Sequence, residues 1–542
     1  MTPPTLAAAA AAAGTTGTTG AIAALPSRYN AADDLLSRNL AAGRGAKTAY
    51  RDDTTALTYA ELDERARRFA GALRAAGLRQ EERLLLCALD TVDFPVVFLG
   101  CLLAGVVPVA VNTLLTADDY AYMLEHCSAR AVVVSEPLLQ VMQAAIDKSG
   151  LSPTVIQAAP HAGAAPSCSV GAMLARMRTP ATTASTGPDD MAFWLYSSGS
   201  TGRPKGTVHT HANLFHTADL YARQVLGIRE ADVVFSAAKL FFAYGLGNAL
   251  TFPLSVGATT VLMAERPTPA AVFKRLCEHK PTLFCGVPTL FAGMLAAPEL
   301  PARVQVALRV CTSAGEALPR DIGERFLAHF GCDILDGIGS TEMLHIFLSN
   351  RPGAVRYGTT GVPVPGYEIR LLDEQCQPCA AGEIGELYIK GPSAALMYWC
   401  NRDKSRETFV GAWTRSGDKY LRDADGYYTY AGRSDDMLKV GGIYVSPFEV
   451  EAALAQHPAV LEAAVIGVTD ADELVKPKAF VVLRPGQQWH DGMAAELQAF
   501  IKSRLAPYKY PRQIECVPEL PKTATGKIQR FRLRQREQAA RG

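Results

Sequence analysis

The sequence predicts an α/β protein with a large N-terminal domain and a small α+β domain at its C-terminal end. Three observations lead to this prediction. Short apolar runs at 130–135, 258–265 and 332–339 alternate with amphipathic helical patterns, which is typical of mostly parallel sheets covered by helices. From about residue 365 the strands alternate apolar and polar residues between tight turns, as in an antiparallel barrel or a sandwich edge. After Arg433 a polar junction leads into a compact pattern of helices and strands.

Individual elements can be read in chain order. Thr58 and Glu61 have the spacing of a capping box, and apolar residues then recur at helical spacing as far as Gly77. The uncharged stretch 94–111 is interrupted by proline and glycine, so it predicts a buried helix and a buried strand rather than a membrane span. In the C-terminal region, Pro447 suits the first turn of a helix, and a second helix is expected near 493–505.

The length of 542 residues is too great for one ordinary core, so we expect at least two domains. We place a flexible tail at 1–28, a first domain at 29–433 and a second domain at 434–542. The tail is rich in Ala, Thr and Gly, and no Lys or Arg precedes its apolar run, which argues against a signal peptide.

Composition excludes several classes of partner. The 54 basic and 53 acidic side chains leave a net charge of +1, so no chain-wide attraction to nucleic acid or to an acidic membrane is expected. The 12 cysteines lack paired spacing, which favours reduced thiols in a cytoplasmic protein. The Cys376 and Cys379 pair lies in "DEQCQPCAAGE", which predicts a turn rather than a zinc or redox site. A small-molecule substrate is the default partner.

The segment "YSSGSTGRPKG" at 196–206 has the composition of a phosphate-binding loop. It does not match the GxxxxGK[ST] loop, because Lys205 is followed by Gly206. Glycines nevertheless let backbone N–H groups turn toward an anion, hydroxyls donate further bonds, and lysine adds charge. A Gly- and Ser-rich surface turn remains the alternative. The predicted phosphate ligands are Ser197, Ser198, Gly199, Ser200, Thr201, Gly202 and Lys205.

Further motifs follow this loop in a fixed order: "SAGE" at 313–316, "DGIGSTE" at 336–342, "TRSGDKY" at 414–420, "GRSDDMLKVGGIYVSPFEVE" at 432–451 and "PKTATGKIQR" at 521–530. Together they resemble the acyl-adenylate-forming (ANL) superfamily of acyl-CoA synthetases, adenylation domains and luciferases. The resemblance covers roughly residues 30 to 540. It implies a large domain of two αβ-layered sheets with a small distorted β-barrel, followed by a small mobile lid domain.

The resemblance also implies a reaction and a role for particular residues. A carboxylate attacks the α-phosphorus of ATP and expels pyrophosphate, so catalysis needs positioning and charge neutralisation. Thr341 would contact phosphate, Glu342 would hold Mg²⁺, and Asp418 with Arg433 would bind the ribose. Lys527 would bridge the substrate carboxylate and the α-phosphate. The remaining AMP contacts would come from Ala314, Gly315, Glu316, Asp336 and Gly337.

Taken alone, each of these residues also fits a purely structural role. Asp418 fits a turn, Glu342 fits a helix cap, and Lys527 lies in a basic tail that would suit a solvated face. Their common order makes that explanation improbable. The resemblance further implies a hinge at Asp435, about which the lid rotates between two half-reactions. Gly441 and Gly442 would then line a passage for the pantetheine arm of coenzyme A.

The acid pocket of this superfamily corresponds here to "KLFFAYGLGN" and "DGIGSTEMLHIFLSN", which resemble the benzoate-activating CoA ligases. Phe242 stands where activators of amino acids carry an Asp, so an α-amino acid would leave a buried ammonium unpaired. A flat apolar slot is therefore expected. Its lining would be Phe242, Ala243, Tyr244, Gly245, Ile338, Gly339, His345 and Ile346, with His345 either a polar pocket residue or a structural histidine.

The expected activity is ATP-dependent activation of benzoate and thioester formation with coenzyme A. Several alternatives stay open: another substituted aryl acid or a small aliphatic acid as substrate, a separate carrier protein as acceptor, and a luciferase-like reaction with oxygen. A nucleotide-binding regulator without catalysis is a more distant alternative. The superfamily is also compatible with a homodimer.

Overall fold

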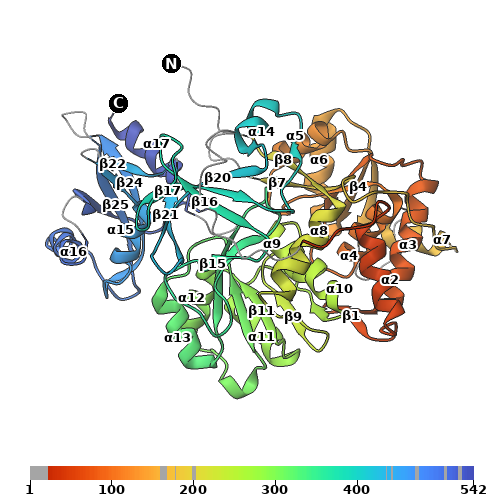
Figure 1. Cartoon of the computed structure of the whole chain (residues 1–542), viewed down its shortest axis with the longest axis horizontal. Helices are drawn as coiled ribbons and strands as arrows, with labels where there is room; N and C mark the ends of the chain where they lie inside the picture. Colours follow the sequence, from red (N-terminus) through yellow and green to blue (C-terminus); the bar gives the residue numbers. More distant parts are fainter. Residues whose placement is uncertain are drawn as a thin grey trace. The chain divides into compact units, whose positions relative to one another are not determined.

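The computed structural model describes residues 22–158, 168–177, 179–197, 203–434, 436–440, 443–469, 475–505, 509–522 and 528–541. Within these residues the chain forms two compact units. The large unit comprises residues up to 369 together with 389–415, and the small unit comprises 370–388 and the residues from 416 onward. The predicted α/β class is confirmed (Figure 1). The division at 433/434 stays a prediction.

The first sheet of the large unit is mostly parallel. In the described residues its order is β15-β14-β13-β12-β11-β9-β10-β1-β2, with antiparallel pairs only at the two edges. The runs predicted as buried strands at 258–265 and 332–339 form β10 and β13 of this sheet. The bounds are β1 (Thr48–Arg51), β2 (Ala56–Thr58), β9 (Val233–Ser236), β10 (Thr259–Val261), β11 (Leu283–Gly286), β12 (Val310–Ser313), β13 (Ile334–Gly339), β14 (Ile346–Ser349) and β15 (Val362–Pro363).

The second sheet of the large unit has the order β18-β8-β7-β4-β3-β5-β6 in the described residues. Strands β7 and β8 form an antiparallel pair that flanks the predicted phosphate loop, with Ser197 opposite Lys205. The bounds are β3 (Arg83–Cys87), β4 (Val107–Ala110), β5 (Ala131–Ser135), β6 (Thr154–Ala158), β7 (Met191–Ser197), β8 (Lys205–Thr210) and β18 (Met397–Tyr398). A further strand of this unit is β19 (Phe409–Val410).

Helices cover and separate the two sheets, which makes layers within the large unit. Apolar residues of α2, α3 and α4 share one core cluster with strands of both sheets. Helices α5 and α6 pack on the seven-stranded sheet, and α11 to α13 pack on the nine-stranded one. The α-helices are α2 (Ala31–Ala41), α3 (Tyr59–Ala75), α4 (Asp93–Ala104), α5 (Ala117–Cys127), α6 (Leu139–Ser149), α7 (Val170–Arg176), α8 (His211–Thr217), α9 (Ala243–Leu246), α10 (Phe252–Val256), α11 (Pro269–Glu278), α12 (Pro288–Ala296), α13 (Arg320–Phe330) and α14 (Arg402–Thr408). The π-helices are η2 (Ala218–Arg223) and η3 (Gly247–Thr251), and short 3₁₀ turns occupy η1 (Glu136–Leu138) and η4 (Arg303–Gln305).

Several local predictions are confirmed. Thr58 and Glu61 form the capping box at the start of α3, and Gly77 lies just beyond the helix with φ 85°. The uncharged stretch 94–111 forms α4 and β4, both buried. Searching the described residues for a helix long and apolar enough to span a bilayer finds no example.

The small unit is built on antiparallel strands and a second, three-stranded sheet. In the described residues, β16 (Glu368–Leu372), β17 (Ile384–Lys390), β20 (Trp413–Arg422) and β21 (Tyr428–Arg433) form one sheet together with β19, and the unit boundaries fall within the first three. Cys376 lies in the turn after β16, with φ 59°. The remaining elements are β22 (Leu438–Val440), β23 (Ile443–Val445), α15 (Pro447–Leu454), β24 (Val460–Thr469), β25 (Val475–Leu483), α16 (Met493–Lys502), β26 (Gln513–Cys516) and α17 (Arg530–Arg541).

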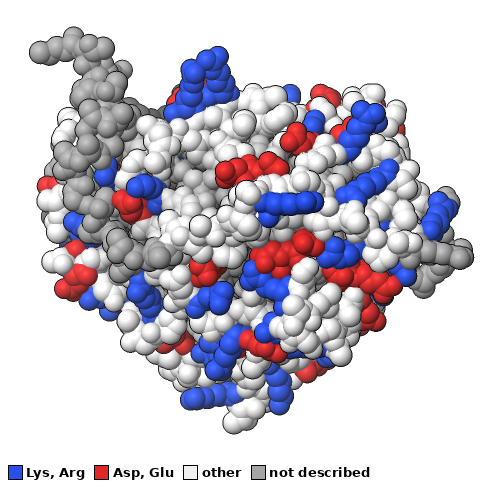
Figure 2. Space-filling view, turned by 45° about the vertical axis from the view of Figure 1, so that its right-hand side comes forward, with Lys and Arg blue, Asp and Glu red and all other residues white. Residues whose placement is uncertain are grey.

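The charged surface shows no large field of one sign on the face that Figure 2 presents. Lysine and arginine are interspersed there with aspartate and glutamate, as the net charge of +1 leads one to expect.

Candidate active site

The segment 340–345, which carries Thr341 and Glu342, is tied to the large unit by its backbone. The carbonyl of Thr341 accepts from His209 Nε2 at 2.8 Å, and the carbonyl of Glu342 accepts from the backbone N–H of Ala395 at 2.8 Å. The carbonyl of Met343 accepts from the Ser393 hydroxyl at 2.8 Å. These bonds fix the backbone on both sides of Glu342, so its side chain projects from a rigid support.

His209 is the buried group behind Thr341. Its side chain lies on β8, is fully buried and stacks on Phe193 at 5.1 Å between ring centroids. Because a carbonyl only accepts, Nε2 must carry the proton, and Nδ1 accepts from Asn213 Nδ2 at 2.8 Å. Burial lowers the pKa of His209 to about 4. The imidazole is therefore neutral at pH 7 and serves as a fixed donor to the Thr341 backbone.

A tyrosine connects the predicted phosphate lysine with the predicted metal carboxylate. Tyr398 Oη donates to Glu342 Oε1 at 2.7 Å, and Lys205 Nζ lies 3.4 Å from the same hydroxyl. The Lys205 ammonium also lies 4.4 Å from the centroid of the Tyr398 ring. Because Lys205 opens β8 and Tyr398 belongs to its neighbour β18, sheet pairing brings these distant residues together.

The predicted adenine residues lie on two neighbouring parallel strands, β12 and β13, and on the loop that follows β12. Ser313, the last residue of β12, is in register with Asp336 on β13, so Ala314 to Glu316 leave β12 at the level where Gly337 continues β13. Asp336 is buried, which raises the pKa of its carboxyl well above the usual range. No described residue bonds its Oδ1. Beside this buried carboxyl group, Gly315 of the loop after β12 is exposed, and loops after the carboxyl ends of parallel strands commonly bind ligands.

The two sequence segments predicted for the acid pocket lie together. His345 donates from Nε2 to the carbonyl of Tyr244 at 3.2 Å, and the two rings lie 5.5 Å apart. Gly247 permits this approach, because a Cβ there would lie 2.3 Å from His345 Cδ2. Burial lowers the pKa of His345 to about 3, and its Nδ1 has no partner among the described residues. His345 therefore combines the two predicted roles: its Nε2 makes a structural hydrogen bond, and its Nδ1 is available as an acceptor in the pocket.

The other predicted pocket residues are partly accessible. Phe242, Ala243, Ile338 and Gly339 are half-buried, while Gly245 and Ile346 are buried. Phe242 packs on Phe241 at 4.5 Å between centroids, which keeps an apolar ring at the start of α9. The lining is thus mostly apolar, with Tyr244 and His345 as the polar members.

The predicted ribose pair belongs to the small unit. Asp418 on β20 faces Arg433 on β21 across the antiparallel ladder, and Arg433 Nη1 donates to Asp418 Oδ1 at 3.1 Å. The same nitrogen donates to the carbonyl of Ser416 at 3.2 Å. The Asp418 carboxylate is thereby oriented by an arginine of the neighbouring strand.

Comparison with known families decides the assignment. The model of the AMP-binding enzyme family matches residues 37–399, and the model of the AMP-binding enzyme C-terminal domain matches residues 449–527. The chain is a member of the AMP-binding enzyme family. The predicted resemblance to the acyl-adenylate-forming superfamily is thereby confirmed.

This AMP-binding enzyme has similar relatives and solved structures. It is 62% identical over 512 residues to a benzoate–CoA ligase of Thauera aromatica, covering 94% of this chain and 96% of the relative. A crystal structure of a benzoate CoA ligase from Burkholderia xenovorans LB400 is 63% identical to this chain, with a TM-score of 0.87. The match covers 93% of this chain and 100% of that one. The structure of the anthranilate CoA ligase AuaEII in complex with anthranoyl-AMP has 42% identity and a TM-score of 0.90, covering 95% and 98%.

Some predicted site residues of this AMP-binding enzyme lie outside the described residues. They are Ser198, Gly199, Ser200, Thr201 and Gly202 of the phosphate loop, the hinge Asp435, the tunnel residues Gly441 and Gly442, and Lys527. Their roles, like those of the described site residues, stay predictions.

Two residues of the site escaped the sequence analysis. Tyr398 lies in "LMYWCN" and His209 in "GTVHTHAN", and neither segment was singled out as a motif. A signal did exist in part, because a histidine within a buried strand needs a polar partner. Which partner it finds depends on how β8, β18 and the 340–345 segment meet.

Proposed function

We propose that this AMP-binding enzyme activates benzoate with ATP and then forms benzoyl-CoA, releasing pyrophosphate and AMP. The observation that carries the proposal is the 62% identity to a benzoate–CoA ligase over 94% of the chain. The mostly apolar lining around Phe242, Tyr244 and His345 supports it, because an uncharged flat ring needs no buried counter-charge there.

In the first half-reaction a benzoate carboxylate oxygen attacks the α-phosphorus of ATP. The bond from that phosphorus to the bridging oxygen breaks, and pyrophosphate leaves. We assign Lys205 and the predicted loop residues to the departing phosphates, Thr341 to phosphate, and Lys527 to the carboxylate and α-phosphate. Positive charge at these places offsets the charge that gathers in the transition state. Asp418 and Arg433 are assigned to the ribose, and Asp336 to the adenine side.

In the second half-reaction the sulfur of coenzyme A attacks the acyl carbon of benzoyl-adenylate. The acyl–oxygen bond breaks, AMP leaves with the electron pair, and the thiol proton passes to solvent. Rotation about Asp435 and passage of the pantetheine arm along Gly441 and Gly442 belong to this proposal.

Magnesium is part of the proposal for Glu342. In the described part of the chain, no cluster of three or more His, Cys, Asp or Glu side chains is placed to hold a metal ion. A single carboxylate fits nonetheless, because Mg²⁺ at phosphate sites commonly takes one or two carboxylates and completes its shell with substrate phosphates and water. Bound there, Mg²⁺ would supply charge neutralisation for the phosphates. We further propose that the protein is cytoplasmic and that it forms a homodimer.

The test is AMP release by the purified protein across a panel of acids, with and without coenzyme A. Benzoate should give AMP and, with coenzyme A, benzoyl-CoA. The panel includes 2-aminobenzoate, 4-hydroxybenzoate and short aliphatic acids, because His345 Nδ1 could accept from a ring substituent. The absence of AMP release with every acid would refute the ligase assignment, and AMP without thioester would indicate another acceptor.

A further inference from the structure

Tyr398 holds a position that none of the predicted roles explains. It is 3% exposed, and it belongs to a strand of only two residues, β18, whose other member Met397 is 40% exposed. The strand alternation therefore turns Tyr398 inward. Its hydroxyl is the group that donates to Glu342 and lies within reach of Lys205.

The hydroxyl can serve both charged groups at once. Its single proton goes to the Glu342 carboxylate, which leaves its oxygen lone pairs facing the Lys205 ammonium at 3.4 Å. The ring adds a second contact, because the Lys205 ammonium lies 4.4 Å from its centroid. One side chain thus orients the carboxylate assigned to Mg²⁺ and the lysine assigned to phosphate.

The support of Tyr398 is itself rigid. Its backbone pairs with Thr207 on β8, and its N–H donates to the Ser405 hydroxyl at 3.0 Å. The ring packs on Phe409 at 5.3 Å between centroids. Three residues before Tyr398, in the segment that leads into β18, the backbone N–H of Ala395 donates to the carbonyl of Glu342. The segment 395–398 therefore holds Glu342 by both its backbone and its side chain.

We propose that Tyr398 is a positioning residue for the ATP half-reaction, which orients Glu342 and Lys205 for Mg·ATP. This inference rests on the proposed function for the identity of the ligand. Hydrogen bonds to charged groups in a partly buried site are worth enough to change binding by about tenfold or more when they are lost. A loss confined to Mg·ATP is the signature, since the acid and coenzyme A do not depend on this bond.

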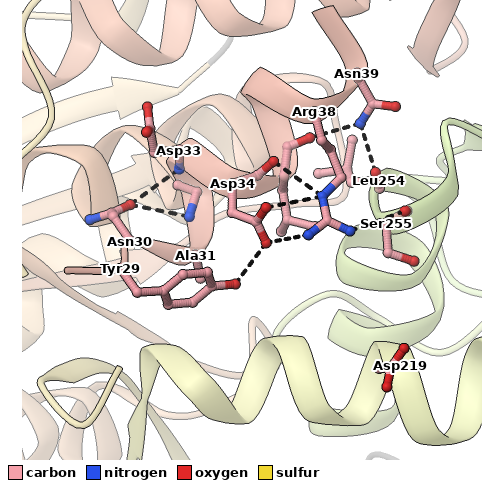
Figure 3. A network of polar contacts seen from close by, with 12 residues as sticks. Tyr29, Asn30, Ala31, Asp33, Asp34, Arg38, Asn39, Asp219, Leu254 and Ser255 are labelled. Atoms are coloured by element: carbon pink, nitrogen blue, oxygen red, sulfur yellow. Dashed lines mark hydrogen bonds and ion pairs between the residues drawn. The ribbon is translucent and has the colours of Figure 1, made fainter. Parts of the chain in front are cut away.

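The test uses Tyr398→Phe, which removes the hydroxyl and keeps the ring. A matched control is Tyr29→Phe, because Tyr29 Oη also donates to a carboxylate, Asp34 Oδ2, at 2.8 Å. Figure 3 shows that bond in the network at α2, where Arg38 donates to both carboxylate oxygens of Asp34. The control deletes the same kind of hydrogen bond from a site with no part in the proposed chemistry.

Two measurements decide the matter. Calorimetry without acid gives the Kd for Mg·ATP, which we expect to rise about tenfold or more in Tyr398→Phe and to stay unchanged in Tyr29→Phe. In the same preparations, thioester formation from supplied benzoyl-adenylate and coenzyme A should remain within about twofold of wild type.

An unchanged Kd for Mg·ATP in Tyr398→Phe would overturn the inference, as would an equal loss in both half-reactions, which marks a general structural role. Failure of the proposed function looks different. Wild-type protein would then release no AMP with benzoate, while the comparison of Mg·ATP binding between the two tyrosine variants still decides the role of Tyr398.

Discussion

Replacing His209 with leucine tests whether the backbone of the Thr341 segment must be held from behind. The substitution removes the only described side-chain donor to the Thr341 carbonyl, which keeps a backbone bond from Leu344 at 3.2 Å. It also removes the acceptor that Asn213 Nδ2 uses, although that group retains a contact with the Ala394 carbonyl at 3.3 Å. Buried polar groups that lose a partner cost about 1–3 kcal/mol, so we expect destabilisation of that size.

The functional loss should exceed the loss of stability. Thr341 and Glu342 are expected to meet the phosphates, and small displacements of positioning groups can cost about 100-fold in rate. We therefore expect kcat/KM for ATP in His209→Leu to fall between about 10- and 100-fold. Pyrophosphate release at varied ATP measures this, and urea unfolding measures the stability. A leucine variant with the wild-type midpoint and wild-type kcat/KM would refute the reasoning.

The variant His209→Gln separates the bond from the charge. Glutamine can donate to Thr341 but does not titrate, so it should recover part of the activity. Burial lowers the pKa of His209 to about 4, below its ordinary value of 6.5. Between pH 4 and pH 6.5 His209 is therefore protonated in the unfolded chain and neutral in the folded one. The stability from neutral His209 is present above pH 6.5 and is lost as pH falls toward 4.

From pH 8 to pH 5 this amounts to about 2 kcal/mol. The wild type should lose that much more stability than His209→Gln over this interval, measured as urea midpoints at each pH. Parallel pH profiles for the two proteins would contradict the assignment of a neutral buried histidine.

Two further substitutions follow from the same structure. Asp336→Asn should leave the free energy of unfolding at pH 7 unchanged or higher. Burial raises the pKa of this carboxyl, so above the unfolded pKa the folded state carries a cost that asparagine removes. A marked drop in the urea midpoint would show an ionised, well-paired aspartate instead. Lys527→Ala should abolish pyrophosphate release while sparing thioester formation from supplied benzoyl-adenylate, and an equal loss of both activities would contradict separate poses for the two half-reactions.

Local patterns in the sequence predict much of the fold. The capping box at Thr58 and the helix and strand of 94–111 depend on short-range sterics and hydrogen bonds, which the sequence displays directly. Strand β7, which ends at Ser197, is a short buried apolar run of the kind that indicates a strand. The π-helical turns at 218–223 and 247–251 could not be foreseen, because i→i+5 bonding leaves no pattern distinct from an α-helix.

The sequence predicts those site residues that belong to a recognisable motif, but not those that reach the site through tertiary packing. The order of the motifs pointed to Lys205 and Glu342 as members of one site. Nothing in the residues around Tyr398 shows that its hydroxyl lies between them, since that depends on the pairing of β18 with β8. The meeting of Tyr244 with His345 was expected from family resemblance, yet the reason it is possible, the missing side chain at Gly247, needed the structure.

The most direct test of the central claim follows the carboxylate oxygen of benzoate. If that oxygen attacks the α-phosphorus, benzoate labelled with ¹⁸O in its carboxylate must transfer one labelled oxygen to AMP when benzoyl-CoA forms. Mass spectrometry of the products should find one ¹⁸O in AMP and none in pyrophosphate. Unlabelled AMP, or ADP with label in inorganic phosphate, would contradict an acyl-adenylate route.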